Sequence, residues 1–255
     1  MLTYNEYSKL KHEIPYKLVI KSNDNYLYYF GERHSFDPKD SQFDVVLDFW
    51  NDFIIKTEGK KRIVFVEGGL RPVETDRDFS ILNHGGMGYV THLANKVDIQ
   101  TYSPEPDEAY ERNELEKKFT KDQIQYYYFA RVVYQWVRKQ EPKPLFEKYI
   151  GKFLEMDKLR SGWVDYDFSL ENMIRIHEEL FKVRFDKNDT DLFYSIVNPV
   201  IINHVINDVS ANSGYVRDEY IVKMIKQYIE VGYSIFAEYG CSHVVMQEPL
   251  LRKVL

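Results

Sequence analysis

The spacing of apolar residues changes along the chain between the period of a strand and that of a helix. Two short β-prone runs, 17–21 and 26–30, enclose the polar segment 22–25, whose Asn and Asp residues are typical of a hairpin turn. Apolar residues then follow helical spacing over 42–57, and a continuous apolar run occupies 63–66. Such a run is typical of a strand covered on both faces in a parallel sheet. This order predicts a βαβ unit with a right-handed crossover.

A glycine-rich segment separates these elements from a third strand. Residues 84–88 contain three glycines and predict a flexible loop, followed by a short helix over 89–96. His84 and His92 are expected to be a loop residue and a helix-surface residue. The third strand is predicted at 98–102.

The block from residue 108 to residue 208 has helical periodicity and lacks strand-like runs. Thr120 and Gln123 have the spacing of a capping box, and Pro142 and Pro144 are expected to end the helix that follows it. The helices predicted in this block cover 121–139, 145–159, 169–183 and 191–206, with the last kinked or split at Pro199.

The α/β pattern returns after this block, with a helix predicted over 216–231, a strand over 234–237 and a short terminal segment. We therefore predict an α/β core formed by residues 1–107 and 209–255, in which a mainly parallel sheet is flanked by helices. Residues 108–208 would form a helical insertion or cap.

Composition narrows the class of protein. The 255 residues are 44% hydrophobic, which allows a sizeable core. A formal charge of −6 argues against nucleic acid as the main partner, because phosphate binding needs a basic face. No window approaches the roughly 20 apolar residues of a membrane span, the start lacks the blocks of a signal peptide, and a single cysteine rules out an intramolecular disulfide framework. We expect a cytoplasmic protein, whose oligomeric state the sequence leaves open.

Ionisable residues follow several of the predicted strands. The tetrads Gly31-Glu32-Arg33-His34 and Gly240-Cys241-Ser242-His243 share a Gly-x-x-His pattern, and each comes directly after or close to a strand. Glu67 follows the run at 63–66, and Glu105 follows the third strand. The carboxyl ends of parallel strands meet along one crevice of an open α/β sheet. The sequence therefore predicts a cleft lined by Glu32, His34, Glu67, His243 and Glu105.

Two chemistries suit these groups. His34, His243 and Glu67 together would hold a divalent metal ion with one position open for water, whose pKa the metal would lower. Zn, Mn and Co all accept such mixed nitrogen and oxygen ligands. Alternatively, His34 would act as a general base for water without a metal, oriented by a neighbouring carboxylate.

Other residues near these motifs have more ordinary explanations. Arg33 or Arg217 would hold a substrate carboxylate or stabilise an oxyanion. Cys241 is expected to fill a tight turn rather than act as a nucleophile, because closeness to His243 in sequence does not provide the necessary geometry. The simpler alternative for the whole set is that the histidines cap strand ends and the carboxylates pair with arginines.

These motifs resemble those of the superfamily that joins erythromycin esterase, the ChaN-type haem-uptake proteins and the TraB/Tiki proteins. The resemblance is carried by Gly31–His34, Glu67-Gly68, the helix from Arg217 to Met224, and Gly240–His243, in the same order along the chain. It covers roughly residues 17–107 and 215–248 and leaves the helical middle unmatched.

The resemblance implies an α/β core with a helical insertion and a site at the strand ends. Its Tiki-like branch implies metal-dependent peptide hydrolysis, with His34, His243 and Glu67 as metal ligands or their close partners. Its esterase branch implies water activation at His34 and Glu67. Its ChaN-type branch implies haem binding and does not require an enzyme. The chain departs from the membrane-anchored members because it contains no transmembrane span.

We therefore predict a hydrolase that cleaves an amide or ester bond of a small-molecule or peptide substrate. Water would be activated at His34, Glu32, Glu67 and His243, with assistance from a divalent metal. Arg33, Arg217 and Glu105 would contact the substrate. The first alternative is a non-catalytic protein that binds haem or another small ligand in the same cleft. A second is an interaction module whose aromatic stretch Tyr126–Trp136 docks a partner.

Overall fold

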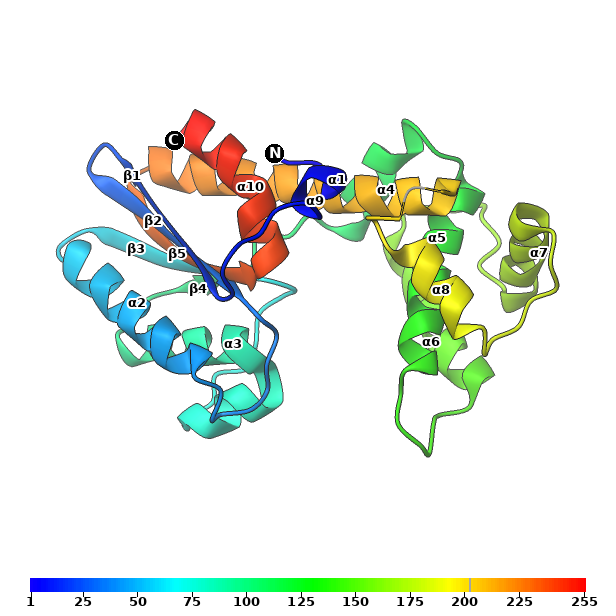
Figure 1. Ribbon diagram of the computed structural model, residues 1–255, viewed down its shortest axis with the longest axis horizontal. Coiled ribbons are helices and arrows are strands. Elements are labelled where there is room, and N and C mark those ends of the chain that lie inside the picture. Colours follow the sequence, from blue (N-terminus) through cyan, green and yellow to red (C-terminus); the bar gives the residue numbers. More distant parts are fainter. Residues whose placement is uncertain (202) are drawn as a thin grey trace. The chain divides into compact units, whose positions relative to one another are not determined.

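The computed structural model, which describes residues 1–201 and 203–255, contains a five-stranded sheet in the order β1-β2-β5-β3-β4 (Figure 1). β1 pairs antiparallel with β2, whereas every other neighbouring pair is parallel. The prediction of an α/β fold with a mainly parallel sheet is thus confirmed. The strands are β1 (Tyr16–Ser22), β2 (Asn25–Glu32), β3 (Lys61–Val66), β4 (Thr101–Tyr102) and β5 (Tyr233–Gly240).

The helices alternate with the strands at both ends of the chain and follow one another without strands in between over the middle. They are α1 (Tyr4–Tyr7), α2 (Gln42–Lys56), α3 (Arg77–Lys96), α4 (Glu108–Glu116), α5 (Lys121–Val137), α6 (Phe146–Arg160), α7 (Leu170–Phe181), α8 (Thr190–Val197), α9 (Val205–Glu230) and α10 (Cys241–Val254). No helix in the described part of the chain combines the length and apolar character needed to cross a membrane.

The predicted hairpin joins β1 and β2. Ser22 pairs with Asn25 across the turn, and Asn23 has a φ of 53°, a left-handed conformation that Asn tolerates better than most residues. The strands on either side of α2 are parallel, as expected, but they are not neighbours. β5 lies between them, and Phe236 pairs with both Tyr28 of β2 and Val64 of β3.

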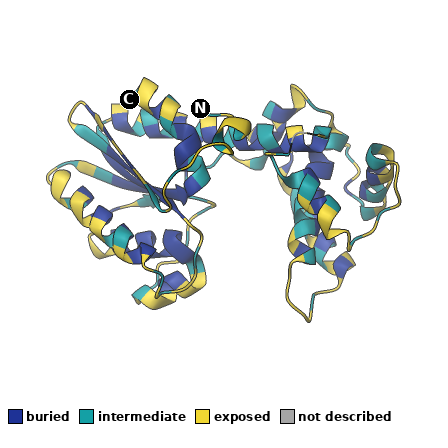
Figure 2. Ribbon diagram, viewed as in Figure 1, coloured by how far each residue is buried: buried dark blue, intermediate teal, exposed yellow. Residues whose placement is uncertain are grey.

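Helices cover both faces of the sheet (Figures 1 and 2). Side chains alternate along β2, so Tyr28 and Phe30 pack with α2 and α3, whereas Leu27 and Tyr29 pack with α9 and α10. The ring of Phe236 lies 5.1 to 5.7 Å from those of Phe49, Trp50 and Phe53 on α2. These buried aromatic groups fix the central strand, and through it the residues at its carboxyl end.

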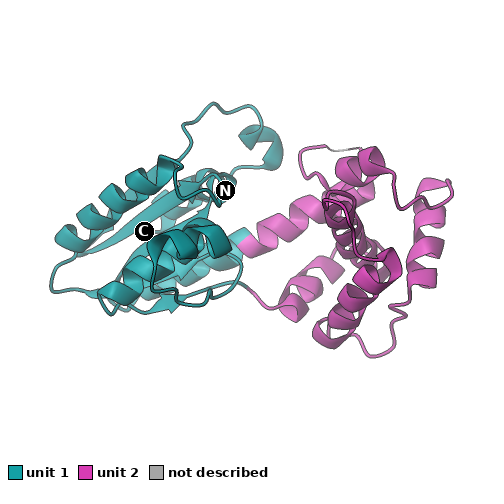
Figure 3. Cartoon of the chain, turned by 90° about the horizontal axis from the view of Figure 1, so that it is seen from below, with its two compact units in different colours: residues 1–105, 218–255 teal, residues 106–217 magenta. Residues whose placement is uncertain are grey.

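The chain divides into two compact units (Figure 3). The sheet unit comprises residues 1–105 and 218–255, and the helical unit comprises residues 106–217. The sequence predicted the boundaries between the α/β core and the helical insertion after residues 107 and 208. The second boundary differs because the helix expected at 216–231 begins at Val205 as α9. Its first half packs into the core of the helical unit, and its second half packs against the sheet.

The helical unit has a core of its own. The capping box of Thr120 and Gln123 begins α5, and α8 and α9 are separate helices on either side of Pro199, both as expected. Every aromatic side chain in the stretch Tyr126–Trp136 is buried or half-buried. The stretch therefore forms the core of this unit rather than an exposed surface for a partner.

The segment predicted as a flexible loop, 84–88, lies instead inside α3, where the helix is kinked at Gly85 (φ 64°, ψ −150°). Gly86 and Gly88 are buried, and a Cβ on either would overlap neighbouring atoms, namely carboxylate oxygens at Gly86 and the Ser80 carbonyl oxygen at Gly88. His92, expected on the surface, is buried against Glu74, whose carbonyl oxygen lies 2.8 Å from its Nδ1. The three glycines predicted a flexible loop, but in the structure they allow close packing within a helix.

Three further expectations need correction. The third strand is only two residues long, at 101–102. The last strand extends to Gly240, so Glu238 lies within β5 rather than beyond it. The short terminal segment is a continuous helix, α10, that starts at Cys241 and contains Pro249. The second Gly-x-x-His tetrad therefore begins a helix, whereas the first leads from β2 into a loop.

Candidate active site at the carboxyl ends of the parallel strands

The predicted site residues surround the carboxyl ends of β2, β5 and β3. Glu32 is the last residue of β2 and pairs with Gly240, the last residue of β5. Glu238 of β5 pairs with Val66, the last residue of β3, and Glu67 directly follows Val66 in the sequence. Because these three strands are adjacent and parallel, their ends bring carboxylates from distant parts of the sequence to one edge of the sheet.

His34 is held by a buried carboxylate. Its Nδ1 lies 2.7 Å from Oε1 of Glu32, whose side chain is almost completely buried. A carboxylate accepts hydrogen bonds, so Nδ1 donates, and the other ring nitrogen, Nε2, keeps its lone pair when the ring is neutral. The bond to Glu32 is the main cause that raises the pKa of His34, and burial acts in the opposite direction.

His243 is held in the same way by a different carboxylate. Its Nδ1 lies 2.6 Å from Oδ1 of Asp218, a buried residue of α9 that also accepts a hydrogen bond from the Nε2 of Gln247 at 2.8 Å. Sequence reasoning missed Asp218. It precedes Ile221 and Ile225 by three and seven positions, so the helical spacing places a carboxylate on the apolar face of α9. That spacing was the available signal.

Glu67 lies between the two histidines. Its Oε2 accepts a hydrogen bond from the backbone N–H of Gly240 at 2.6 Å, and its Oε1 lies 3.5 Å from Nε2 of His243. A Cβ on Gly240 would lie 3.1 Å from Nε2 of His34 and 3.4 Å from Oε2 of Glu67. The lack of a side chain at Gly240 thus lets these groups approach. Gly240 is also the N-cap of α10, where the helix dipole favours a negative charge.

A further carboxylate, Glu238, lies next to Glu32. Oxygens of both side chains border the position that a Cβ on Gly86 would occupy. Glu238 is fully buried, and neither of its carboxylate oxygens has a hydrogen-bond partner among the described residues. Burial, then the charges of Glu32 and Glu67, raise the pKa of Glu238 well above its ordinary value. Burial likewise raises the pKa of Glu32, and the bond to His34 opposes that shift. Glu238 was missed because the strand was expected to end before it.

A cavity of about 210 Å³ opens beside this cluster. It is lined by Glu32 and His34, by residues of α3 around Gly85, and by Arg71. Arg71 makes no ion pair in the part of the chain that the structure describes. A guanidinium nitrogen of Arg71 lies 3.2 Å from where a Cβ on Gly68 would be. The cavity therefore contains a cation that the sequence reasoning did not single out.

The other predicted residues, Glu67 and His243 included, are not among those that line this cavity. The guanidinium of Arg33 pairs with Asp40 at 2.7 Å and is largely exposed. Glu105 accepts a hydrogen bond from the backbone N–H of Gly68 at 3.3 Å. Arg217 belongs to the helical unit and lines a cavity there. Cys241 is the buried first residue of α10 rather than part of a turn, and burial raises its pKa to about 11, which favours the unreactive thiol.

This arrangement has the parts needed for proton transfer to and from water. Two imidazoles are each oriented by a buried carboxylate, and a third carboxylate lies between them. The donor types would also suit a divalent metal, since His34 and His243 offer Nε2 and Glu67 offers oxygens. Among the described residues, however, no three His, Cys, Asp or Glu side chains are positioned around a single metal-sized point.

Comparisons of the chain with protein-family models, with curated proteins and with solved structures gave no match. The likeness to the erythromycin esterase, ChaN and TraB/Tiki superfamily therefore stays a prediction that depends on the motifs and their order.

Proposed function

We propose that this protein is a hydrolase that uses water to cleave an amide or ester bond at the cluster of His34, Glu67 and His243. One observation carries the proposal. Each histidine donates its Nδ1 hydrogen to a buried carboxylate, and the Nε2 atoms of both lie near the carboxylate of Glu67. Structural histidines that merely cap strand ends do not require two separate buried carboxylates to orient them.

In the proposed reaction, His34 acts as the general base. Its Nε2 takes a proton from water as the water oxygen attacks the carbonyl carbon of the substrate, and the same proton then passes to the departing oxygen or nitrogen. Glu32 stabilises the imidazolium that forms, because the Nδ1–Oε1 hydrogen bond is then charge-assisted. Glu67 lies close to both rings and adds to this stabilisation. Arg71 would bind a negative group of the substrate, because it lines the cavity and Arg33 and Arg217 do not.

This mechanism sets the direction of the pH dependence. A general base works only when it is deprotonated, and the bond to Glu32 raises the pKa of His34. The rate should therefore increase as the pH rises through that raised pKa and then level off.

A divalent metal ion remains a variant of the same proposal, in which His34, Glu67 and His243 would hold it. Bound there, it would lower the pKa of a coordinated water. The hydrogen bonds to Glu32 and Asp218 would keep the two Nε2 atoms directed to it. Elemental analysis of the purified protein, repeated after growth with Zn, Mn or Co, tests this variant.

The test of the hydrolase is a screen with chromogenic esters and aminoacyl amides, comparing the wild type with His34→Ala, His243→Ala and Glu67→Gln. We expect each substitution to reduce kcat/KM by about 10²–10⁴-fold, the usual contribution of a positioned acid or base. His204→Ala is the matched control, since His204 stacks on Phe181 in the helical unit. Full activity in His34→Ala would refute the proposal. A Soret band on adding haem that is lost in His34→Ala or His243→Ala, with no hydrolysis, would favour the binding alternative.

A further inference from the structure

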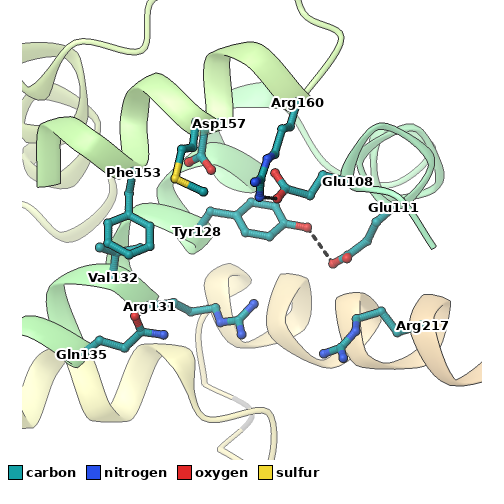
Figure 4. A pocket seen from close by; sticks show the side chains of 11 residues that line it. Glu108, Glu111, Tyr128, Arg131, Val132, Gln135, Phe153, Asp157, Arg160 and Arg217 are labelled. Carbon is teal, nitrogen blue, oxygen red and sulfur yellow. Dashed lines mark hydrogen bonds and ion pairs between the residues drawn. The ribbon is translucent and has the colours of Figure 1, made fainter. Parts of the chain in front are cut away.

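A second cavity, of about 320 Å³, lies within the helical unit (Figure 4). Its walls come from α4, α5, α6 and α9, and they combine charged groups with an apolar side. The apolar side is formed by Val132, Phe153 and Met156. None of the predicted catalytic residues belongs to this cavity.

Arginines point into this cavity from two helices. Figure 4 shows the guanidinium groups of Arg131, from α5, and Arg217, from α9, turned toward each other on one side of Tyr128. The pKa of Arg131 is raised, first by its interaction with Tyr127, whereas the charge of Arg217 acts in the opposite direction. Two like charges that face one cavity repel each other.

The carboxylates of the cavity are already used. Glu111 accepts hydrogen bonds from the hydroxyls of Tyr128 at 2.6 Å and Ser213 at 2.5 Å. Glu108 pairs with Arg160 at 3.0 Å. The third carboxylate, Asp157, accepts a hydrogen bond from the side-chain nitrogen of Gln125 at 2.7 Å and lies 3.5 Å from Arg112.

Arg131 differs from all these groups. Its guanidinium contacts the ring of Tyr127 at 5.5 Å but makes no hydrogen bond or ion pair with the described residues. A half-buried guanidinium presents five N–H donors, and burial without acceptors is costly.

We propose that this cavity binds a small organic anion, a carboxylate or phosphate carried on an apolar body, with its charged end on Arg131 beside Arg217 and its apolar body against Val132, Phe153 and Met156. The guanidinium fork of Arg131 matches two oxygens of such a group. The volume of about 320 Å³ accommodates a ligand of single-ring size. This site is independent of the proposed hydrolase.

The experiment is isothermal titration of the full-length protein with phenyl phosphate, benzoate and inorganic phosphate, each at up to about 10 mM, which detects dissociation constants in the millimolar range. We expect phenyl phosphate or benzoate to bind, and to bind more tightly than inorganic phosphate. Arg131→Gln should weaken binding at least about tenfold, the effect of losing one charge-assisted contact.

Arg138→Gln is the matched control. Arg138 is the C-cap of α5 and likewise stacks on a tyrosine four residues earlier, Tyr134, at 5.3 Å, but it does not line the cavity. Its substitution should leave the affinity unchanged. If Arg131→Gln does not fold, Arg131→Lys takes its place, because it keeps the charge and loses the two-pronged geometry, and weaker binding is again expected. The proposal is overturned if no probe binds, if inorganic phosphate binds as well as the aromatic anions, or if neither Arg131 variant changes the affinity.

Discussion

At the scale of single residues, the candidate site depends on carboxylates that the protein buries. Glu32, Asp218 and Glu238 are all almost inaccessible to solvent, although ionised carboxylates favour water. Two of them are compensated by hydrogen bonds from histidines, and Glu238 is not. Burial raises the pKa values of Glu32 and Glu238, and groups with such shifts cluster at functional sites more often than elsewhere. Each of these carboxylates therefore has a testable role.

Asp218 is expected to position His243 rather than to contact the substrate. In Asp218→Asn, an amide N–H would face the Nδ1 of His243, so the ring hydrogen should move to Nε2. We expect the ¹⁵N chemical shifts of the imidazole to show the changed tautomer, and hydrolysis to fall by about 10²-fold or more. Glu219→Gln, at the exposed neighbouring position, should change neither. An unchanged His243 tautomer in Asp218→Asn would contradict this role.

Glu238 should make the stability of the protein depend on pH. Because its pKa is raised in the folded state, the unfolded chain loses this proton first as the pH rises above about 4.5, the ordinary value for Glu. The free energy of unfolding then falls by at most about 1.4 kcal/mol per pH unit until the raised pKa is reached. Glu238→Gln cannot ionise, so it should unfold like the wild type at low pH and be increasingly more stable at higher pH. Urea unfolding at a series of pH values measures the difference, and a constant difference would contradict the shift.

At the scale of secondary-structure elements, the kinked helix α3 closes the site from one side. Gly86 allows the helix backbone to approach Glu32 and Glu238 more closely than any side chain would permit, Gly85 adopts the positive φ of the kink, and Gly88 leaves room for His84 and the Ser80 carbonyl oxygen. The same residues in a solvent-exposed helix would only weaken it. Packing therefore explains why a helix of this protein contains three glycines within four positions, 85–88.

Replacing Gly86 by alanine tests this packing. Its new Cβ would overlap the carboxylates of Glu32 and Glu238, so we expect a loss of about 1–3 kcal/mol in the free energy of unfolding, as for other overpacked cores. Gly151→Ala in α6 is the matched control. No atom lies within 4 Å of a Cβ there, so the variant should gain about 0.5–1 kcal/mol from helix propensity. Equal effects of the two substitutions in urea unfolding would contradict the close approach.

At the scale of the whole molecule, two compact units share one helix, and each unit has its own core. Asp218, which orients His243, is the first residue of α9 that belongs to the sheet unit. The proposed hydrolytic site lies within the sheet unit, and the proposed anion site lies within the helical unit. The two proposals can therefore be tested separately.

Separate cores predict local effects of core substitutions. Phe129 is buried in the helical unit and Phe53 in the sheet unit, and truncating either to alanine should cost about 3–5 kcal/mol. We expect Phe129→Ala to reduce hydrogen-exchange protection mainly in α5 to α8, and Phe53→Ala mainly in α2 and the strands. Hydrogen-exchange mass spectrometry resolves these regions. Uniform loss of protection throughout the chain in both variants would show that the units unfold as one.

The sequence by itself determined the α/β class, the hairpin, most helices and the group formed by His34, Glu67 and His243. Apolar periodicity is a local property, and the carboxyl ends of parallel strands meet by geometry alone. The same reasoning placed Arg33 and Arg217 at the site, because closeness along the chain does not reveal which way a side chain points.

Only the tertiary structure decided which groups support these histidines. Glu238, Asp218 and Arg71 become neighbours of the site through the insertion of β5 between β2 and β3, the length of α9 and the path of the loop after β3. These features depend on contacts between segments far apart in the sequence. A carboxylate on the apolar face of a helix, such as Asp218, is hard to explain from the sequence of that helix alone. Its role becomes clear once His243, the histidine that it orients from another part of the chain, is known.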